Sequence, residues 1–209
     1  QTLARINGLS NPNLIFPGQV LRTPGGGDAP APAPAPGPVP APGPAPAPGP
    51  GAASLDRGSF YLQQPDGWSC GPASLTMALA AWGVRPATIE TRNEAIGLIG
   101  QRWGEGVPGN ASLIANGARK AGLQASFNPS GEASAVRAAL DEGKTVVLNG
   151  GLPGGGGHFI YVAGVDANGN FIVGDPARPG ITRMTASELQ AFSYANPGQH
   201  PNGFAAIWK

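Results

Sequence analysis

The chain has 209 residues, which is enough for one well-packed domain and a smaller module. Its net charge of +1 and its charged fraction of 12% argue against nucleic acid or an anionic membrane as a partner. No run of about 18 apolar residues predicts a membrane span. No signal peptide is visible at Gln1, which fits a trimmed chain or an unconventional export route. A single cysteine builds no disulfide framework, so cysteine usage leaves the redox compartment open.

Residues 1–24 are too few to hold a core alone, although Leu3, Ile6 and Leu9 could line one side of a short helix. The string Asn7-Gly-Leu-Ser-Asn-Pro-Asn-Leu-Ile-Phe-Pro-Gly-Gln-Val-Leu-Arg22 resembles the second half of a LysM domain. That resemblance implies binding to the N-acetylglucosamine-containing glycan of peptidoglycan or chitin. The first strand and first helix of a LysM unit are absent, so we expect a partial module whose glycan binding stays open.

Residues 25–53 are rich in proline, alanine and glycine, and 28–50 form an almost uncharged Pro/Ala/Gly tract. Such a tract cannot bury a core, and its prolines hold it extended. At ~3.1 Å per residue it reaches on the order of 70 Å. We therefore interpret 25–53 as a semi-rigid linker. A proline-rich ligand for a partner domain is the alternative, although the usual flanking basic residues are missing.

Residues 54–209 contain the remaining predicted elements. Apolar patterns and stop signals predict helices over Pro72–Trp82, Thr88–Trp103, Ala111–Ala121, Ala133–Glu142 and Ser187–Phe192. Strands are predicted over Thr145–Leu148, His158–Val165, Asn170–Asp175 and Gly203–Trp208, with a hairpin turn at Asp166–Gly169. The glycine-rich run Gly150–Gly157 predicts a loop able to move over the site. Because helices precede strands, we expect an α+β fold.

Cys70 stands in the run Gln64-Pro-Asp-Gly-Trp-Ser-Cys-Gly-Pro-Ala-Ser74, just before the predicted helix Pro72–Trp82. Pro72 suits a first helical turn. Unpaired N–H groups and the helix dipole at that position favour a thiolate, which indicates a nucleophile. The alternative is a buried structural cysteine that packs as a small apolar side chain.

His158 is the candidate base, because imidazole titrates near neutrality and the residue begins an apolar strand. A core histidine bonded to a backbone carbonyl is the alternative. His200, the other histidine, lies in a polar turn-like stretch and is expected at the surface. With one cysteine and two histidines, no familiar metal spacing appears, and we expect no cofactor.

Asp175 ends the strand that we expect to pair with the His158 strand, so its carboxylate could orient the imidazole. It could also be only a strand-ending residue before proline. Asp166 is the rival, but turn chemistry explains it without catalysis. An acyl-transfer site also needs oxyanion donors, and the candidates are the Cys70 N–H and the Gln64 amide, with Gln63 as a substitute. Either glutamine alone would normally be a solvated polar residue.

Together these residues resemble the papain-like cysteine peptidases and, within them, the C39-like group. The match rests on Gln64, Cys70-Gly-Pro-Ala-Ser-Leu75, Gly157-His-Phe-Ile-Tyr-Val-Ala-Gly-Val-Asp166 and Gly174-Asp-Pro176, and it covers 60 to about 195. The resemblance implies that N-terminal helices pack on an antiparallel sheet. It also implies a Cys70 nucleophile, a His158 base, an Asp175 orienter and a Gln64 oxyanion donor. No transporter segment is present, so the Gly–Gly specificity of the exporter relatives is not transferred.

Three functions compete. The first is a cysteine peptidase acting on a protein or peptide through a Cys-His-Asp triad, as in a secreted antibacterial effector. The second is a peptidoglycan endopeptidase or amidase targeted by LysM, with the wall as partner. The third is a non-catalytic binding domain. We expect a secreted or envelope-associated bacterial protein, with delivery into another cell and an immunity or inhibitor partner as open options for a toxin.

Overall fold

The computed structural model describes residues 57–107, 111–152, 156–195 and 203–209. The chain divides into two units, Gln1–Pro46 and Ala47–Lys209, and every described residue belongs to the second. The LysM-like segment, the linker and His200 therefore lie outside the described residues. In the part of the chain that the structure describes, no helix is both long and apolar enough to cross a membrane.

The described residues form an α+β fold. The helices are α2 (Cys70–Ala81), α3 (Ile89–Ile99), α4 (Ser112–Lys120), α5 (Ala133–Asp141) and α6 (Ala186–Tyr194). The strands are β1 (Gln124–Asn128), β2 (Thr145–Gly151), β3 (Gly157–Val165), β4 (Phe171–Gly174), β5 (Ile181–Met184) and β6 (Phe204–Trp208).

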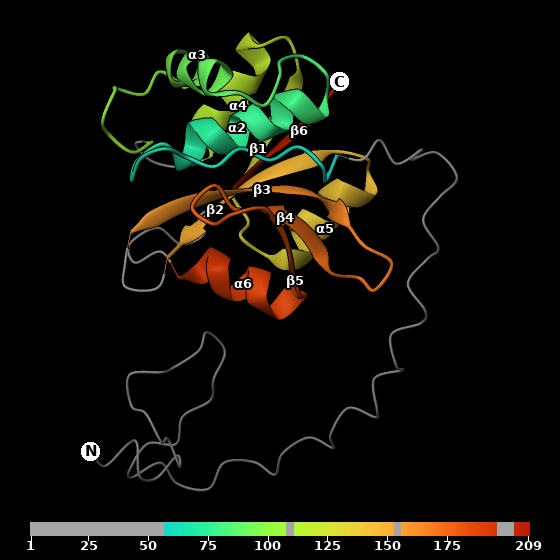
Figure 1. Ribbon diagram of the computed structural model, residues 1–209. Coiled ribbons are helices and arrows are strands. Elements are labelled where there is room, and N and C mark those ends of the chain that lie inside the picture. Colours follow the sequence, from blue (N-terminus) through green and yellow to red (C-terminus); the bar gives the residue numbers. More distant parts are fainter. Residues whose placement is uncertain (1–56, 108–110, 153–155, 196–202) are drawn as a thin grey trace, which may run out of the picture. The chain divides into compact units, whose positions relative to one another are not determined.

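One six-stranded sheet in the order β1-β6-β2-β3-β4-β5 organises the domain, and each printed strand pair is antiparallel. Helices α2, α3 and α4 cover one face, and α5 and α6 cover the other (Figure 1). Apolar side chains on the central strands point alternately to the two faces of the sheet, and they form one hydrophobic core on each face. On β3, Phe159 and Tyr161 pack with α2, whereas Ile160 and Val162 pack on the opposite side. The central strands are therefore buried on both faces.

Helix α2 is buried along all of its 12 residues, as its apolar composition predicts. The hydroxyl of Ser74 donates to the carbonyl of Phe159 on β3 at 3.1 Å, which joins the helix to the sheet near its first turn. Gly71 is closely packed, because a Cβ there would lie 2.3 Å from Cγ2 of Val107. The Ser74 bond thus holds the N-terminal end of α2 against β3, and Val107 packs closely over Gly71.

Several boundaries differ from the predictions. Helix α3 ends at Ile99 because Gly100 adopts φ +78° and caps it, so the expected extension to Trp103 is wrong. A loop was expected over Gly150–Gly157. Both of its ends are strand instead, because Gly150 and Gly151 belong to β2 and Gly157 belongs to β3. Two strands, β1 and β5, were not predicted, and because of β1 helix α5 lies between strands rather than before the first of them. Helix α6 lies between strands, as its predicted range did.

Candidate active site

Cys70 is the first residue of α2, with Ser69 as its N-cap. The Ser69 side chain makes no capping hydrogen bond, and Cys70 is only 9% exposed. Its thiol therefore lies where the positive end of the helix dipole favours negative charge. The helix predicted to follow the cysteine thus includes it, and Pro72 sits in the first turn as expected.

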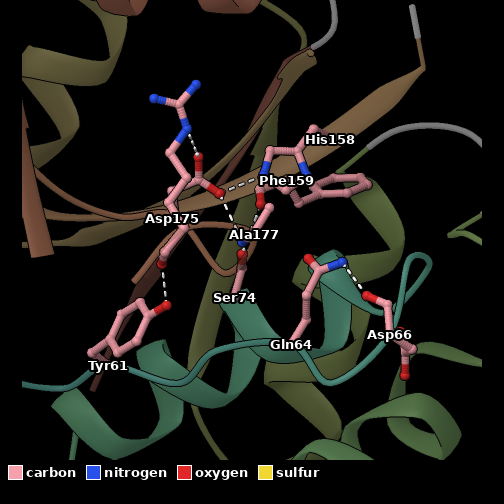
Figure 2. Close-up of polar contacts among 9 residues, drawn as sticks. Tyr61, Gln64, Asp66, Ser74, His158, Phe159, Asp175 and Ala177 are labelled. Carbon is pink, nitrogen blue, oxygen red and sulfur yellow. Dashed lines mark hydrogen bonds and ion pairs between the residues drawn. The ribbon is translucent and has the colours of Figure 1, made fainter. Parts of the chain in front are cut away.

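His158 and Asp175 form the central contact of the site. Nε2 of His158 lies 2.6 Å from Oδ1 of Asp175, as the dashed line in Figure 2 marks. His158 is on β3 and Asp175 directly follows β4, and the β3–β4 pairing of Tyr161 with Gly174 brings their ends together. Both are buried, with exposed fractions of 2% and 8%. The hairpin predicted from the sequence is therefore the element that places the carboxylate beside the imidazole.

The His158 imidazole also interacts with Cys70. Burial lowers the pKa of His158, but hydrogen bonds to Asp175 and Cys70 and the charges of both outweigh it and raise the pKa to about 9. The ring is therefore an imidazolium at neutral pH. Because Nε2 faces Asp175, the other ring nitrogen is the one left for the thiol.

The Asp175 carboxylate is held ionised. Burial raises its pKa, yet the hydrogen bond and charge of His158, the Ala177 N–H and the Arg178 guanidinium together lower it below its usual value. The Ala177 N–H donates to Oδ1 at 2.9 Å, and Nε of Arg178 lies 3.4 Å from Oδ2. The Asp175 side chain is thus fixed from two sides while it faces His158.

Gln64 is tied to the same region, whereas Gln63 is exposed. The Gln64 N–H donates to the carbonyl of Pro176 at 2.9 Å, next to Asp175. Nε2 of Gln64 donates to the carbonyl of Asp66 at 2.5 Å (Figure 2). That carbonyl acceptor assigns Nε2 to this end of the amide and leaves its second N–H for another acceptor, while Oε1 of Gln64 is buried without a hydrogen-bond partner among the described residues.

Phe192 on α6 packs against the imidazole and was not singled out from the sequence. Its ring lies 6.1 Å from the His158 ring in an edge-to-face arrangement. Gly150 pairs with His158 across β2 and β3, and a Cβ there would lie 2.3 Å from Cε1 of Phe192. The missing side chain at Gly150 is therefore what lets α6 approach the histidine.

Asp166 lies in the hairpin turn, as expected for a residue with a turn role. Its Oδ1 accepts from the N–H groups of Asn168 and Asn170, each at 2.9 Å, and Oδ2 lies 3.3 Å from Arg183. Among the described residues, no group of three or more His, Cys, Asp and Glu side chains could hold a metal ion.

The sequence matches two family models. The Peptidase_C39 like family matches residues 59–200, and the LysM domain matches residues 1–24. No curated protein matches the chain. The LysM match points to the cell envelope or to peptidoglycan.

Solved structures share the fold. A C39-like peptidase from Bacillus anthracis aligns with a TM-score of 0.54 and 12% identity, covering 73% of this chain and 96% of that chain. The peptidase domain of Streptococcus ComA, a bifunctional ABC transporter, aligns with a TM-score of 0.51 and 20% identity, covering 72% and 96%. With the family match over most of the domain, this chain belongs to the Peptidase_C39 like family and is a papain-like cysteine peptidase, a hydrolase.

Proposed function

We propose that the protein hydrolyses peptide bonds through a triad of Cys70, His158 and Asp175. The observation that carries the proposal is the buried imidazole, which is bonded to Asp175 at 2.6 Å and also interacts with the thiol at the start of α2. The raised pKa of His158, about 9, keeps the imidazole protonated at neutral pH, so that it can donate a proton to the leaving amine. Asp175 keeps the ring oriented and stabilises its positive charge.

The reaction follows from these positions. The Cys70 sulfur attacks the scissile carbonyl carbon, and the carbonyl π electrons move to oxygen. The developing oxyanion is stabilised by the Cys70 N–H and by the free N–H of the Gln64 amide. The His158 imidazolium then protonates the leaving amine as the C–N bond breaks, which leaves an acyl group on Cys70 as a thioester. Neutral His158 next takes a proton from water, and the hydroxide equivalent releases the acid and restores the thiolate.

The substrate is a protein or peptide, and two settings fit. One is a protein target of a secreted antibacterial effector, delivered into another cell and restrained by an immunity or inhibitor protein. The other is the stem peptide of peptidoglycan, which the LysM match over residues 1–24 favours because that module binds wall glycan. The Pro/Ala/Gly tract of 28–50 would then let the peptidase reach stems around a wall-bound LysM segment.

Purified sacculi test the wall hypothesis directly. They are incubated with the intact chain and with Cys70→Ala, and released products are identified by mass spectrometry. Soluble stem-peptide fragments that need Cys70 establish a peptidoglycan endopeptidase or amidase. If none appear, a search of a bacterial lysate for new N-termini tests the protein-substrate hypothesis.

A pair of histidine variants controls these assays. His158→Ala should abolish hydrolysis, while His200→Ala, at the only other histidine of the sequence, should leave it unchanged. If the protein is folded and thiol-reactive but cleaves neither sacculi nor lysate proteins, the hypothesis of a non-catalytic binding domain is favoured.

A further inference from the structure

Asp66 closes the turn that leads into α2. Its Oδ1 accepts from the N–H groups of Trp68 at 3.1 Å and Ser69 at 2.9 Å. Its carbonyl accepts from the Gln64 side chain at 2.5 Å, as Figure 2 shows. One residue therefore holds both the amide proposed as an oxyanion donor and the backbone directly before Cys70.

Arg92 holds the Asp66 side chain from α3. It is only 3% exposed, and its Nη2 lies 3.4 Å from Oδ2 of Asp66. The guanidinium also lies over two indole rings, 5.6 Å from the centroid of Trp68 and 5.4 Å from that of Trp103. The two indoles meet edge to face at 5.4 Å. The cation is thus enclosed by two aromatic rings and directed at one carboxylate.

A buried arginine at this position is costly for the fold alone. Arg92 belongs to the buried stripe of α3 with Ala95, Ile96 and Ile99, where an apolar residue would pack without desolvating a charge. Within the described residues, Nε and Nη1 of Arg92 have no hydrogen-bond partner. Because the buried charge meets its counter-ion in the turn before Cys70, its placement is better explained by the site than by the core.

We propose that Arg92 and Asp66 are positioning residues for the oxyanion site. Arg92 fixes the Asp66 carboxylate, and Asp66 fixes the Gln64 amide and the backbone that leads to the Cys70 N–H. Neither residue touches the substrate. This inference rests on the proposed hydrolysis by Cys70, because it concerns the donors that stabilise the oxyanion of that reaction.

Two probes separate the oxyanion site from the thiol. p-Nitrophenyl acetate transfers its acetyl group to the Cys70 sulfur through an oxyanion: the C–S bond forms, the aryl C–O bond breaks, and p-nitrophenolate leaves with its electron pair. Iodoacetamide alkylates the same sulfur by displacing iodide and forms no oxyanion. The ratio of the two second-order rate constants in the full-length chain therefore reports on the donors, whereas the alkylation rate alone reports on the nucleophile.

The variants are Arg92→Met, Asp66→Asn and their combination. Asp66→Asn keeps an Oδ1 acceptor for the two turn N–H groups and removes only the charge. We expect acylation to fall on the order of 10- to 100-fold in each single variant, with alkylation within about twofold of the parent. The double variant should lose no more than the worse single variant, because both changes remove one interaction.

Arg85→Met is the matched control, because Arg85 pairs with Glu94 of α3 at 3.2 Å in an exposed position beyond the other end of α2. It should change neither rate. Arg92→Lys keeps the charge without the planar group and should give an intermediate acylation rate, which keeps the test valid if Arg92→Met unfolds.

Unchanged acylation rates in Asp66→Asn and Arg92→Lys overturn the inference. An equal fall of the acylation and alkylation rates also overturns it, because such a fall indicates a general structural role. If the folded parent is alkylated at Cys70 but neither acylated there nor able to hydrolyse any substrate, the proposed function fails and the inference fails with it. If the parent is active and the variants are acylated as fast as the parent, the inference fails while the proposed function stands.

Discussion

The proton held by His158 should make the stability of the fold depend on pH. The pKa of His158 is raised from 6.5 to about 9 in the folded chain, so the folded state binds this proton more tightly than the unfolded state. That preference corresponds to about 3 kcal/mol of the free energy of unfolding. It is fully present below about pH 6.5 and is lost as the pH rises through about 9. The His158 proton should therefore contribute a fall of about 2 to 3 kcal/mol in the free energy of unfolding between pH 6 and pH 9.5.

Asp175→Asn tests the cause of this change. The substitution removes the carboxylate charge that raises the pKa of His158, while burial continues to lower that pKa. The His158 contribution to this pH dependence should therefore shrink by more than half. Asp141→Asn is the matched control, because Asp141 forms an exposed pair with Arg137 on α5 at 2.8 Å and should leave the pH dependence unchanged.

Urea unfolding under reducing conditions, followed by circular dichroism at several pH values, measures this difference. NMR titration of the His158 ring proton gives the same pKa independently. An equal pH dependence of the free energy of unfolding in the parent and in Asp175→Asn, or a His158 ring proton that titrates near its ordinary pKa, would refute the assignment of a coupled imidazolium at this position.

Three further outcomes follow from the same structure. The basic limb of kcat/KM should fall through about pH 9, the pKa of His158, and Asp175→Asn should move that limb to lower pH in a pH–rate profile. Gly150→Ala should lower the free energy of unfolding in urea by about 1 to 3 kcal/mol, because its Cβ would lie 2.5 Å from the carbonyl oxygen of Phe192. Gly164→Ala is the control and should cost less, because a Cβ there would have nothing within 4 Å. Thr185→Ala removes the capping box of α6 and should lower its thermal unfolding midpoint, at a cost of about 1 kcal/mol.

The positions of Cys70, His158 and Asp175 in the fold were predictable because each residue belongs to a local pattern. Cys70 precedes an apolar helical segment, and its position at the start of α2 follows from that pattern alone. His158 lies on a strand of alternating buried residues, and the turn Asp166–Gly169 predicts the hairpin that returns the chain to Asp175. The close approach of His158 and Asp175 then follows from one antiparallel pairing, which needs no knowledge of distant packing.

The missed strands lack such patterns. In β1, Gln124–Asn128, polar residues dominate and the strand lies at one edge of the sheet. In β5, Ile181–Met184, no residue is buried, and the strand forms the opposite edge. Edge strands exchange fewer apolar contacts than central ones, so their sequences carry a weaker alternation. The pairing of β6 between β1 and β2 is likewise set by the whole sheet.

The support around the site depends on contacts between distant segments. The Pro65-Asp66-Gly67 sequence indicates a turn, but only the approach of α3 shows that its carboxylate meets Arg92. The one sequence signal is that Arg92 occupies the buried stripe of α3, where a charge is unexpected. The family motif therefore contains the proposed nucleophile, base and orienter, whereas the buried ion pair that we propose to position the oxyanion donors lies outside that motif. Acyl transfer should accordingly respond to changes on α3 that leave every motif residue in place.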